Sequence, residues 1–80
     1  MRARVIVTLR RGVLDPAGQA VGNSLRHLGF GEVGDVRLGK VIDLELGSVS
    51  RAEAEKRVGE MSQKLLANPV IEDFSLELTD

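Results

Sequence analysis

The fold of this chain is decided by one short stretch, Gly12-Val13-Leu14-Asp15-Pro16-Ala17-Gly18. The Asp15 carboxylate can accept hydrogen bonds from the free amide groups of a first helical turn. Pro16 suits the next position, where its missing N–H would have no partner inside the helix. The stretch therefore predicts that a helix begins at Pro16 with Asp15 as its N-cap.

The residues on either side of this stretch follow two different periods. Residues 3–9 alternate between two faces and are rich in β-branched types, which predicts a strand. After Pro16 the apolar side chains recur every three or four residues, which predicts an amphipathic helix that carries Ala17, Val21, Leu25 and Leu28 on one face. Gly18 and Gly22 weaken this helix and suggest close approach of another backbone, and Gly29 and Gly31 mark its end.

Residues 32–46 contain two alternating runs separated by Gly39-Lys40. Glycine in the first position of a two-residue loop suits a type II′ turn, so the pattern predicts a β-hairpin. Ser50 and Glu53 form a capping-box pattern that begins a second helix, which should end near Leu66 or Ala67, ahead of Pro69. A last alternating run at residues 73–78 predicts the final strand.

The element order β-α-β-β-α-β in 80 residues predicts one domain spanning residues 1–80. The expected class is α+β: an antiparallel sheet with both helices on one face, a ferredoxin-like two-layer sandwich. A chain this short buries only about 60–65% of its unfolded surface. Since it has no cysteine for a disulfide, self-association is expected to complete the core.

Composition narrows the classes of partner. The net charge of −1 gives no long-range attraction to nucleic acid or anionic membranes, and the only aromatic side chains are Phe30 and Phe74. No apolar run reaches the roughly 20 residues of a membrane span, and no signal-peptide pattern begins the chain. A cytoplasmic protein is expected. The first eleven residues are basic and the last nine acidic. These charges form two patches for two partners or, as we expect, pair across neighbouring first and last strands.

No pattern of catalytic or metal-binding residues stands out. His27, the only histidine, falls near the polar side of the first helix and has no predictable partner. Asp35, Asp43 and Glu45 alternate with apolar residues and predict one polar sheet face. Arg37 and Lys40 leave two interpretations open: they grip a phosphate or a partner's carboxylate, or they belong to ordinary turn chemistry.

Three blocks of sequence resemble the PurS family, the small subunits of phosphoribosylformylglycinamidine (FGAM) synthase. They are LDPAG at Leu14–Gly18, VGDVRLGK at Val33–Lys40 and KLLANPVIEDF at Lys64–Phe74. The resemblance runs from Val5 to Leu78.

The resemblance implies a non-catalytic subunit of an ATP-dependent C–N ligase in purine biosynthesis. Such a subunit holds a synthetase large subunit and a glutaminase subunit together and supports ammonia transfer. The implied state is a homodimer or higher oligomer, with no active site, metal or cofactor on this chain and with ATP and magnesium on the large subunit. The candidate residues for partner interfaces are Asp15, Pro16, Gly18, Arg37, Gly39, Lys40 and Asn68.

A second hypothesis is a free-standing regulatory module of ferredoxin-like fold that binds a small molecule. The element order and the Arg37/Lys40 pair motivate it. For self-association, Ile6 and Val41 lie on the sheet face opposite the main apolar stripes and are candidates for a contact between copies.

Overall fold

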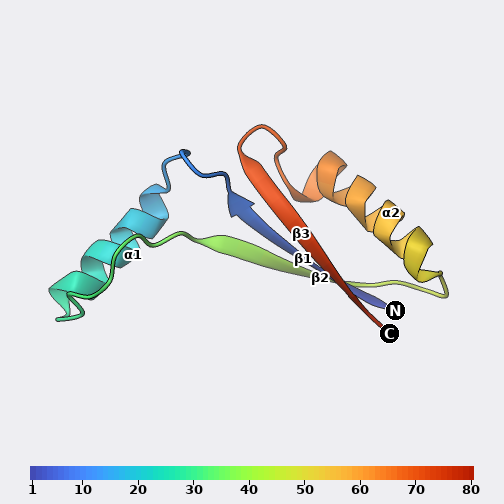
Figure 1. Cartoon of the computed structure of the whole chain (residues 1–80), viewed down its shortest axis with the longest axis horizontal. Coiled ribbons are helices and arrows are strands. Elements are labelled where there is room, and N and C mark those ends of the chain that lie inside the picture. Colours follow the sequence, from blue (N-terminus) through green and yellow to red (C-terminus); the bar gives the residue numbers. More distant parts are fainter.

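A computed structural model describes residues 1–80 and shows three strands and two helices (Figure 1). The elements are β1 (Arg2–Leu9), α1 (Pro16–His27), β2 (Gly39–Glu45), α2 (Arg51–Met61), the π-helical turn η1 (Ser62–Leu66) and β3 (Glu72–Thr79). The strands form one antiparallel sheet in the order β2-β1-β3. The α+β class and the antiparallel sheet are confirmed.

The central strand β1 divides its side chains between two faces. Val5 lies opposite Ile42 on one side and Leu76 on the other, whereas Arg4 lies opposite Asp43 and Glu77. Because strand residues alternate, one face is apolar and the other is charged. The apolar face packs against α2, and the buried core there consists of Ala3, Val5, Val7, Val58 and Ala67.

Helix α2 begins where the sequence predicts; it ends at Met61, and its continuation η1 ends at Leu66, where the helix was expected to stop. The Ser50 hydroxyl accepts a hydrogen bond from the Glu53 N–H at 3.1 Å, which confirms the cap. At the other end the helix widens into η1, where the Ala67 N–H donates to the Ser62 carbonyl at 2.8 Å. The buried Ser62 hydroxyl donates to the Val58 carbonyl, so no polar group is stranded beneath the turn.

The predicted hairpin over residues 32–46 does not form. Only β2 is a strand, and Gly39 lies within it, opposite Thr8, so Gly39-Lys40 is not a turn. Residues 32–38 instead run along α1. The Arg26 guanidinium donates to the carbonyls of Val33 and Gly34, both at 3.0 Å, and these carbonyls therefore bond to a side chain rather than to a neighbouring strand.

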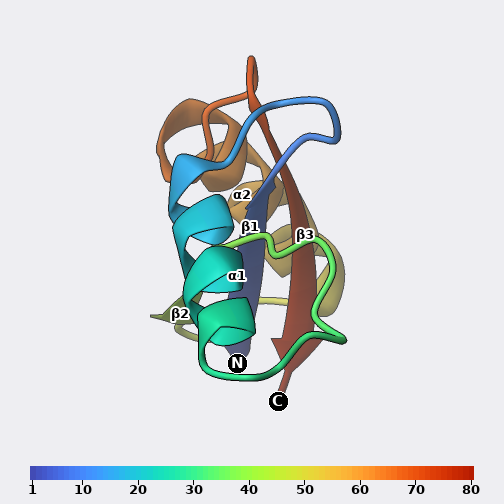
Figure 2. The same ribbon diagram turned by 90° about the vertical axis from the view of Figure 1, so that its left-hand side faces the viewer.

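Helix α1 does not pack on the sheet beside α2. With residues 28–38 it forms an extension, called here the arm (residues 16–38), that leaves one end of the sheet (Figures 1 and 2). The Cα radius of gyration is 16.0 Å, against about 12 Å for a compact chain of this length. The expectation of two helices on one face therefore fails within a single chain, because the connection at residues 10–15 directs α1 away from the sheet.

The core is correspondingly small. Only 10 of 80 residues are buried, and the largest apolar side chains among them are valines. Several apolar side chains on the same sheet face are only partly covered, including Ile42, Leu44 and Leu46. A single helix thus covers a face wide enough for two.

Replacing a core valine tests this assignment against an exposed one. We expect Val5→Ala to lower the free energy of unfolding by about 2 kcal/mol, from the lost methyl burial and the cavity left behind. Val70→Ala is the matched control, since Val70 is 77% exposed and should change stability by less than about 0.5 kcal/mol. Urea unfolding at one protein concentration measures both, and equal effects would contradict the assigned core.

Candidate functional site

The Asp15 carboxylate joins the start of α1 to the start of β2. One oxygen accepts from the Gly18 N–H at 2.8 Å, and the other accepts from the Leu38 N–H at 2.8 Å. The predicted N-cap is confirmed, but the second bond reaches across 23 positions. The Gly18 and Leu38 N–H groups lower the pKa of Asp15 below its ordinary value, and the Arg37 guanidinium adds to this.

Gly18 lets the arm fold back on itself. A β-carbon at this position would lie 2.2 Å from the Val36 carbonyl oxygen, a distance that no side chain can adopt. Gly22 is one turn further along α1, and a β-carbon there would lie 3.2 Å from the Val36 side chain. The two glycines therefore permit the close approach of another backbone that the sequence suggested.

Arg37 binds the chain that leads into α1. Its guanidinium donates to the carbonyls of Arg10 at 3.0 Å and Val13 at 2.8 Å. The sequence left open whether Arg37 grips an anion or belongs to ordinary turn chemistry. In the structure its guanidinium binds the carbonyls of a loop. Lys40, its companion in the sequence, is exposed on β2 and lines a hollow of about 280 Å³ with Asp15 and Gly39.

Arg10 is a residue that sequence reasoning missed. Its N–H donates to the Ile71 carbonyl at 2.9 Å, and its guanidinium donates to the Pro69 carbonyl and pairs with Asp73 at 3.4 Å. It thus ties the chain before α1 to the turn before β3. In the sequence nothing separates Arg10 from its neighbour Arg11, because both are basic residues at a strand end.

The remaining candidates lie near this junction. Pro16 occupies the first turn of α1. Gly39 lets β2 approach β1, because a β-carbon there would lie 2.7 Å from the Val7 carbonyl oxygen. Asn68 orders the turn before β3, since its side-chain oxygen accepts from the Val70 N–H at 3.0 Å. The contacts made by Asp15, Gly18, Arg37, Leu38 and Arg10 together form the junction between the arm and the sheet.

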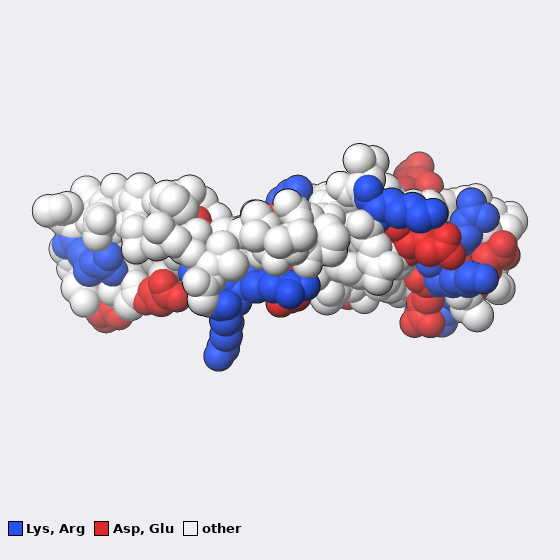
Figure 3. Space-filling view, turned by 90° about the horizontal axis from the view of Figure 1, so that it is seen from above, with Lys and Arg blue, Asp and Glu red and all other residues white.

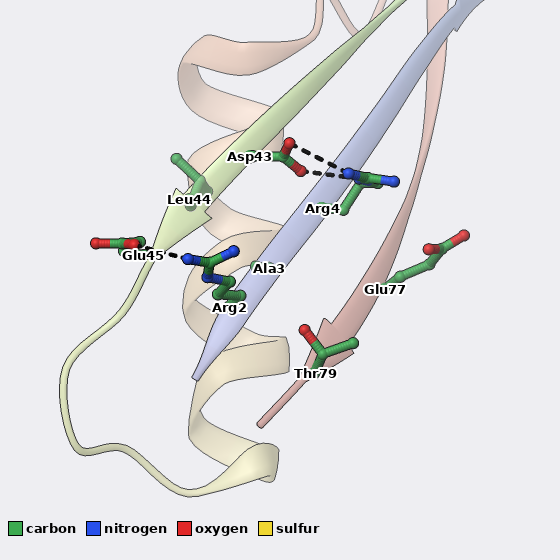
Figure 4. A pocket seen from close by; sticks show the side chains of 8 residues that line it. All are labelled: Arg2, Ala3, Arg4, Asp43, Leu44, Glu45, Glu77 and Thr79. Atoms are coloured by element: carbon green, nitrogen blue, oxygen red, sulfur yellow. Dashed lines mark hydrogen bonds and ion pairs between the residues drawn. The ribbon is translucent and has the colours of Figure 1, made fainter.

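The charged sheet face carries a set of ion pairs rather than a catalytic pair (Figure 4). Arg4 binds Asp43 at 2.8 Å, and Arg2 binds Glu45 at 3.2 Å, across β1 and β2. The hydrogen bond from Arg4 lowers the pKa of Asp43. These pairs partly fill a hollow of about 500 Å³ that β3 borders through Glu77 and Thr79.

The first and last strands are neighbours, as expected, but the expected pairing of their charges is wrong for Arg2 and Arg4, whose salt-bridge partners lie on β2. Only the Arg10–Asp73 ion pair joins the basic start of the chain to its acidic end. Register explains Arg2, which faces Glu45 on β2 and the uncharged Thr79 on β3, whereas Arg4 lies opposite both Asp43 and Glu77 and hydrogen-bonds to Asp43. Asp35 belongs to the arm and therefore does not share the polar face of the sheet with Asp43 and Glu45.

Other candidates for chemistry are dispersed. His27 is exposed in the last turn of α1, far along the arm. No three side chains of types that bind metals converge. Neither helix has the length and apolar character needed to cross a membrane.

The arm carries several of the exposed apolar side chains, and others lie outside it, including Leu65 at 83% and Val70 at 77% exposure. Leu28 is 73% exposed, Phe30 is 49% exposed, and Val21 lies on the same apolar stripe. Seen from above, charged side chains crowd at the α2 end and few lie over α1 (Figure 3). An exposed apolar surface with few charges is typical of a site where proteins bind one another.

Comparison with known proteins assigns the chain to a family. The family model described as PurS, phosphoribosylformylglycinamidine (FGAM) synthase, matches residues 2–80. The chain belongs to the PurS family. The PurS subunit of Synechocystis is 47% identical over 76 residues, which cover 95% of this chain and 76% of that protein. The subunit from Archaeoglobus fulgidus is 46% identical, with 95% of each chain covered.

Solved PurS structures share the fold, including the extended arm. Bacillus subtilis PurS superposes with a TM-score of 0.89 at 42% identity and covers 99% of this chain and 98% of that one. A structure described as PurLQS from Thermotoga maritima gives a TM-score of 0.84 at 32% identity, covering 95% and 94% of the two chains. The chain is thus a PurS subunit of FGAM synthase, a ligase complex of purine biosynthesis.

The Asp15 contacts predict how stability depends on pH. Because folding lowers the pKa of Asp15, its contribution is complete above the ordinary value of 3.8 and is lost as the pH falls through the lower folded value. The gap in unfolding free energy between the wild type and Asp15→Asn should stay constant from neutral pH to about pH 5 and narrow below pH 4. Urea unfolding across this range measures it.

Asp35→Asn is the matched control for this experiment. Asp35 is an exposed carboxylate of the arm that accepts no hydrogen bond from the chain. A gap of the same size and the same pH dependence for Asp35→Asn would contradict the assignment to Asp15.

Proposed function

We propose that this chain is the non-catalytic subunit that bridges the synthetase large subunit and the glutaminase subunit of FGAM synthase. In this role it supports ammonia transfer for the ATP- and glutamine-dependent conversion of formylglycinamide ribonucleotide to FGAM. ATP and magnesium bind to the large subunit, and the complex works in the cytoplasm. The observation that carries the proposal is the exposed apolar arm on a PurS fold, and the PurLQS structure from T. maritima supports it.

The first partner of this chain is a second copy of itself. The α2 side of the sheet has room for another helix, because Ile42, Leu44 and Leu46 are only partly covered. The arm in turn presents an apolar helix that its own sheet does not cover. If each chain lays α1 on the other's sheet, both surfaces are buried and the two-helix layer is restored. Such an exchange of equivalent elements is a common route to dimers.

The charges of α1 fit this arrangement. The helix contains no acidic residue, and its two basic residues, Arg26 and His27, lie in the last turn, away from the middle of the apolar stripe. Full burial of a side chain the size of Val21 or Leu28 contributes about 1.5–3 kcal/mol. Burying several such side chains from each copy makes the net free energy of association favourable, after the entropic cost of association is subtracted.

The bridging role is tested by measuring FGAM formation with glutamine and with ammonia as nitrogen sources. With all three subunits present, both sources should support the reaction. Omitting this chain should abolish most of the glutamine-dependent rate and leave the rate at high ammonia concentration largely intact, because only the first requires transfer between subunits. An unchanged glutamine-dependent rate without the chain would refute the proposal.

The dimer is tested by placing a charge on the apolar stripe of α1. Val21→Asp should raise the dimer dissociation constant at least about tenfold, because burying an unpaired carboxylate is costly. Gln19→Asp is the matched control, since Gln19 is exposed on another side of the same helix. Sedimentation equilibrium measures both, and a wild-type chain that stays monomeric at high concentration would rule out the dimer.

A further inference from the structure

The arm is held together internally as one unit. Gly18 and Gly22 let α1 pack closely against Val36. The Arg26 guanidinium closes the far end by donating to the carbonyls of Val33 and Gly34. The outgoing helix and the returning segment thus pack together near Gly18 and Gly22 and are hydrogen-bonded at the far end. The two halves of the arm form one unit, whose orientation to the sheet depends on its connections.

Only two chain crossings connect the arm to the sheet. One is the outgoing segment 10–15, which contains Gly12 in a left-handed conformation with φ of 88°. The other is the return at Leu38, where β2 begins at Gly39. Two single-chain connections by themselves would allow the arm to swing, and a swinging helix would lose orientational freedom on docking.

The junction links these two crossings to each other. Asp15, at the end of the outgoing segment, accepts from the Leu38 N–H of the returning one. Arg37, on the returning segment, donates to the carbonyls of Arg10 and Val13 on the outgoing one. Each of the two connecting segments thus donates to the other and accepts from it. Rotation of the arm about either segment would break charge-assisted hydrogen bonds.

Arg10 extends this linkage to the far edge strand of the sheet. Its carbonyl accepts from Arg37, while its N–H and guanidinium bind Ile71, Pro69 and Asp73 around the start of β3. A continuous series of bonds therefore runs from the arm, through Arg37 and Arg10, to β3. It lies outside the α2-covered core of Ala3, Val5, Val7, Val58 and Ala67.

We propose that Arg37 and Asp15 are positioning residues that hold the arm at a fixed angle to the sheet, in the orientation in which it docks on a second copy. This inference rests on the dimer proposed above. A pre-oriented arm lowers the entropic cost of assembly without adding a contact to the interface. It also explains why two sequence blocks far apart in the chain, Leu14–Gly18 and Val33–Lys40, each supply half of the junction.

The test measures the arm angle directly. The chain has no cysteine, so spin labels can be placed cleanly at Gln19→Cys on α1 and Glu55→Cys on α2, both of which are exposed. Doubly labelled chains are mixed with an excess of unlabelled chain, so that each dimer carries one labelled copy. Pulsed electron resonance then gives the distribution of distances between arm and sheet within one chain.

Arg37→Gln should broaden this distribution and raise the dimer dissociation constant by about tenfold. Arg37→Lys keeps the cation and should recover part of both effects, and it serves as the informative variant if Arg37→Gln fails to fold. Arg11→Gln is the matched control: it removes the same charge from an exposed neighbour of Arg10 and should leave the distances and the dissociation constant unchanged.

Three results would overturn the proposal. A lower melting temperature for Arg37→Gln with unchanged distances and dissociation constant would make the role merely structural. Weaker dimers with an unchanged distance distribution would place Arg37 in the interface itself. A broader distance distribution with an unchanged dimer dissociation constant would show that the arm angle does not affect assembly. A monomeric wild type refutes the dimer instead, and the distances then still report whether the junction fixes the arm.

Discussion

A single carboxylate with two backbone partners determines how this chain is arranged. Asp15 accepts from Gly18, in the first turn of α1, and from Leu38, which precedes β2. The two segments that it joins enclose the whole arm between them. Because Asp15 as a residue is only 5% exposed, water cannot readily replace either donor. The position of more than a quarter of the chain thus depends in part on a side chain that a capping rule describes incompletely.

The arm leaves the chain with an incomplete core, and this incompleteness has a physical consequence. A compact fold of 80 residues would cover the sheet with both helices, but here the largest fully buried side chains are valines. Folding leaves apolar side chains exposed on α1 and only partly covered on the sheet. Both surfaces are available to the dimer proposed above.

The local parts of this fold were predictable, and the non-local parts were not. The caps at Asp15 and Ser50 depend on residues within three positions, and both were identified from the sequence. The segment with Val36 and Leu38 has the alternation of a strand, yet it pairs with a helix, because Gly18 and Gly22 leave room for it there. Periodicity gives the two faces of a segment but does not identify its neighbour.

The same limit applies to the candidate site. Asp15, Gly18 and Arg37 were singled out by the family blocks, but their common purpose became visible only when Leu38 and Arg10 joined them in space. The sequence does not distinguish Arg10 from Arg11, since both are basic residues after the first strand. They differ in the structure, where Arg10 contacts the turn before β3. Backbone carbonyls accept from Arg37 and Arg10, and carbonyls carry no sequence signature at all.

The three blocks that identify the family therefore encode geometry. Leu14–Gly18 and Val33–Lys40 build the two sides of the junction, and Lys64–Phe74 supplies the turn that Arg10 binds. None of these contacts needs a substrate to explain it, since each satisfies a backbone N–H or carbonyl group. For an enzyme such a pattern would be puzzling, because distinctive motifs usually mark chemistry. For a subunit whose proposed contribution is to hold two catalytic partners at a fixed separation, the angle of the arm is itself the functional quantity. Motifs that fix this angle then serve the function as directly as catalytic residues serve an active site.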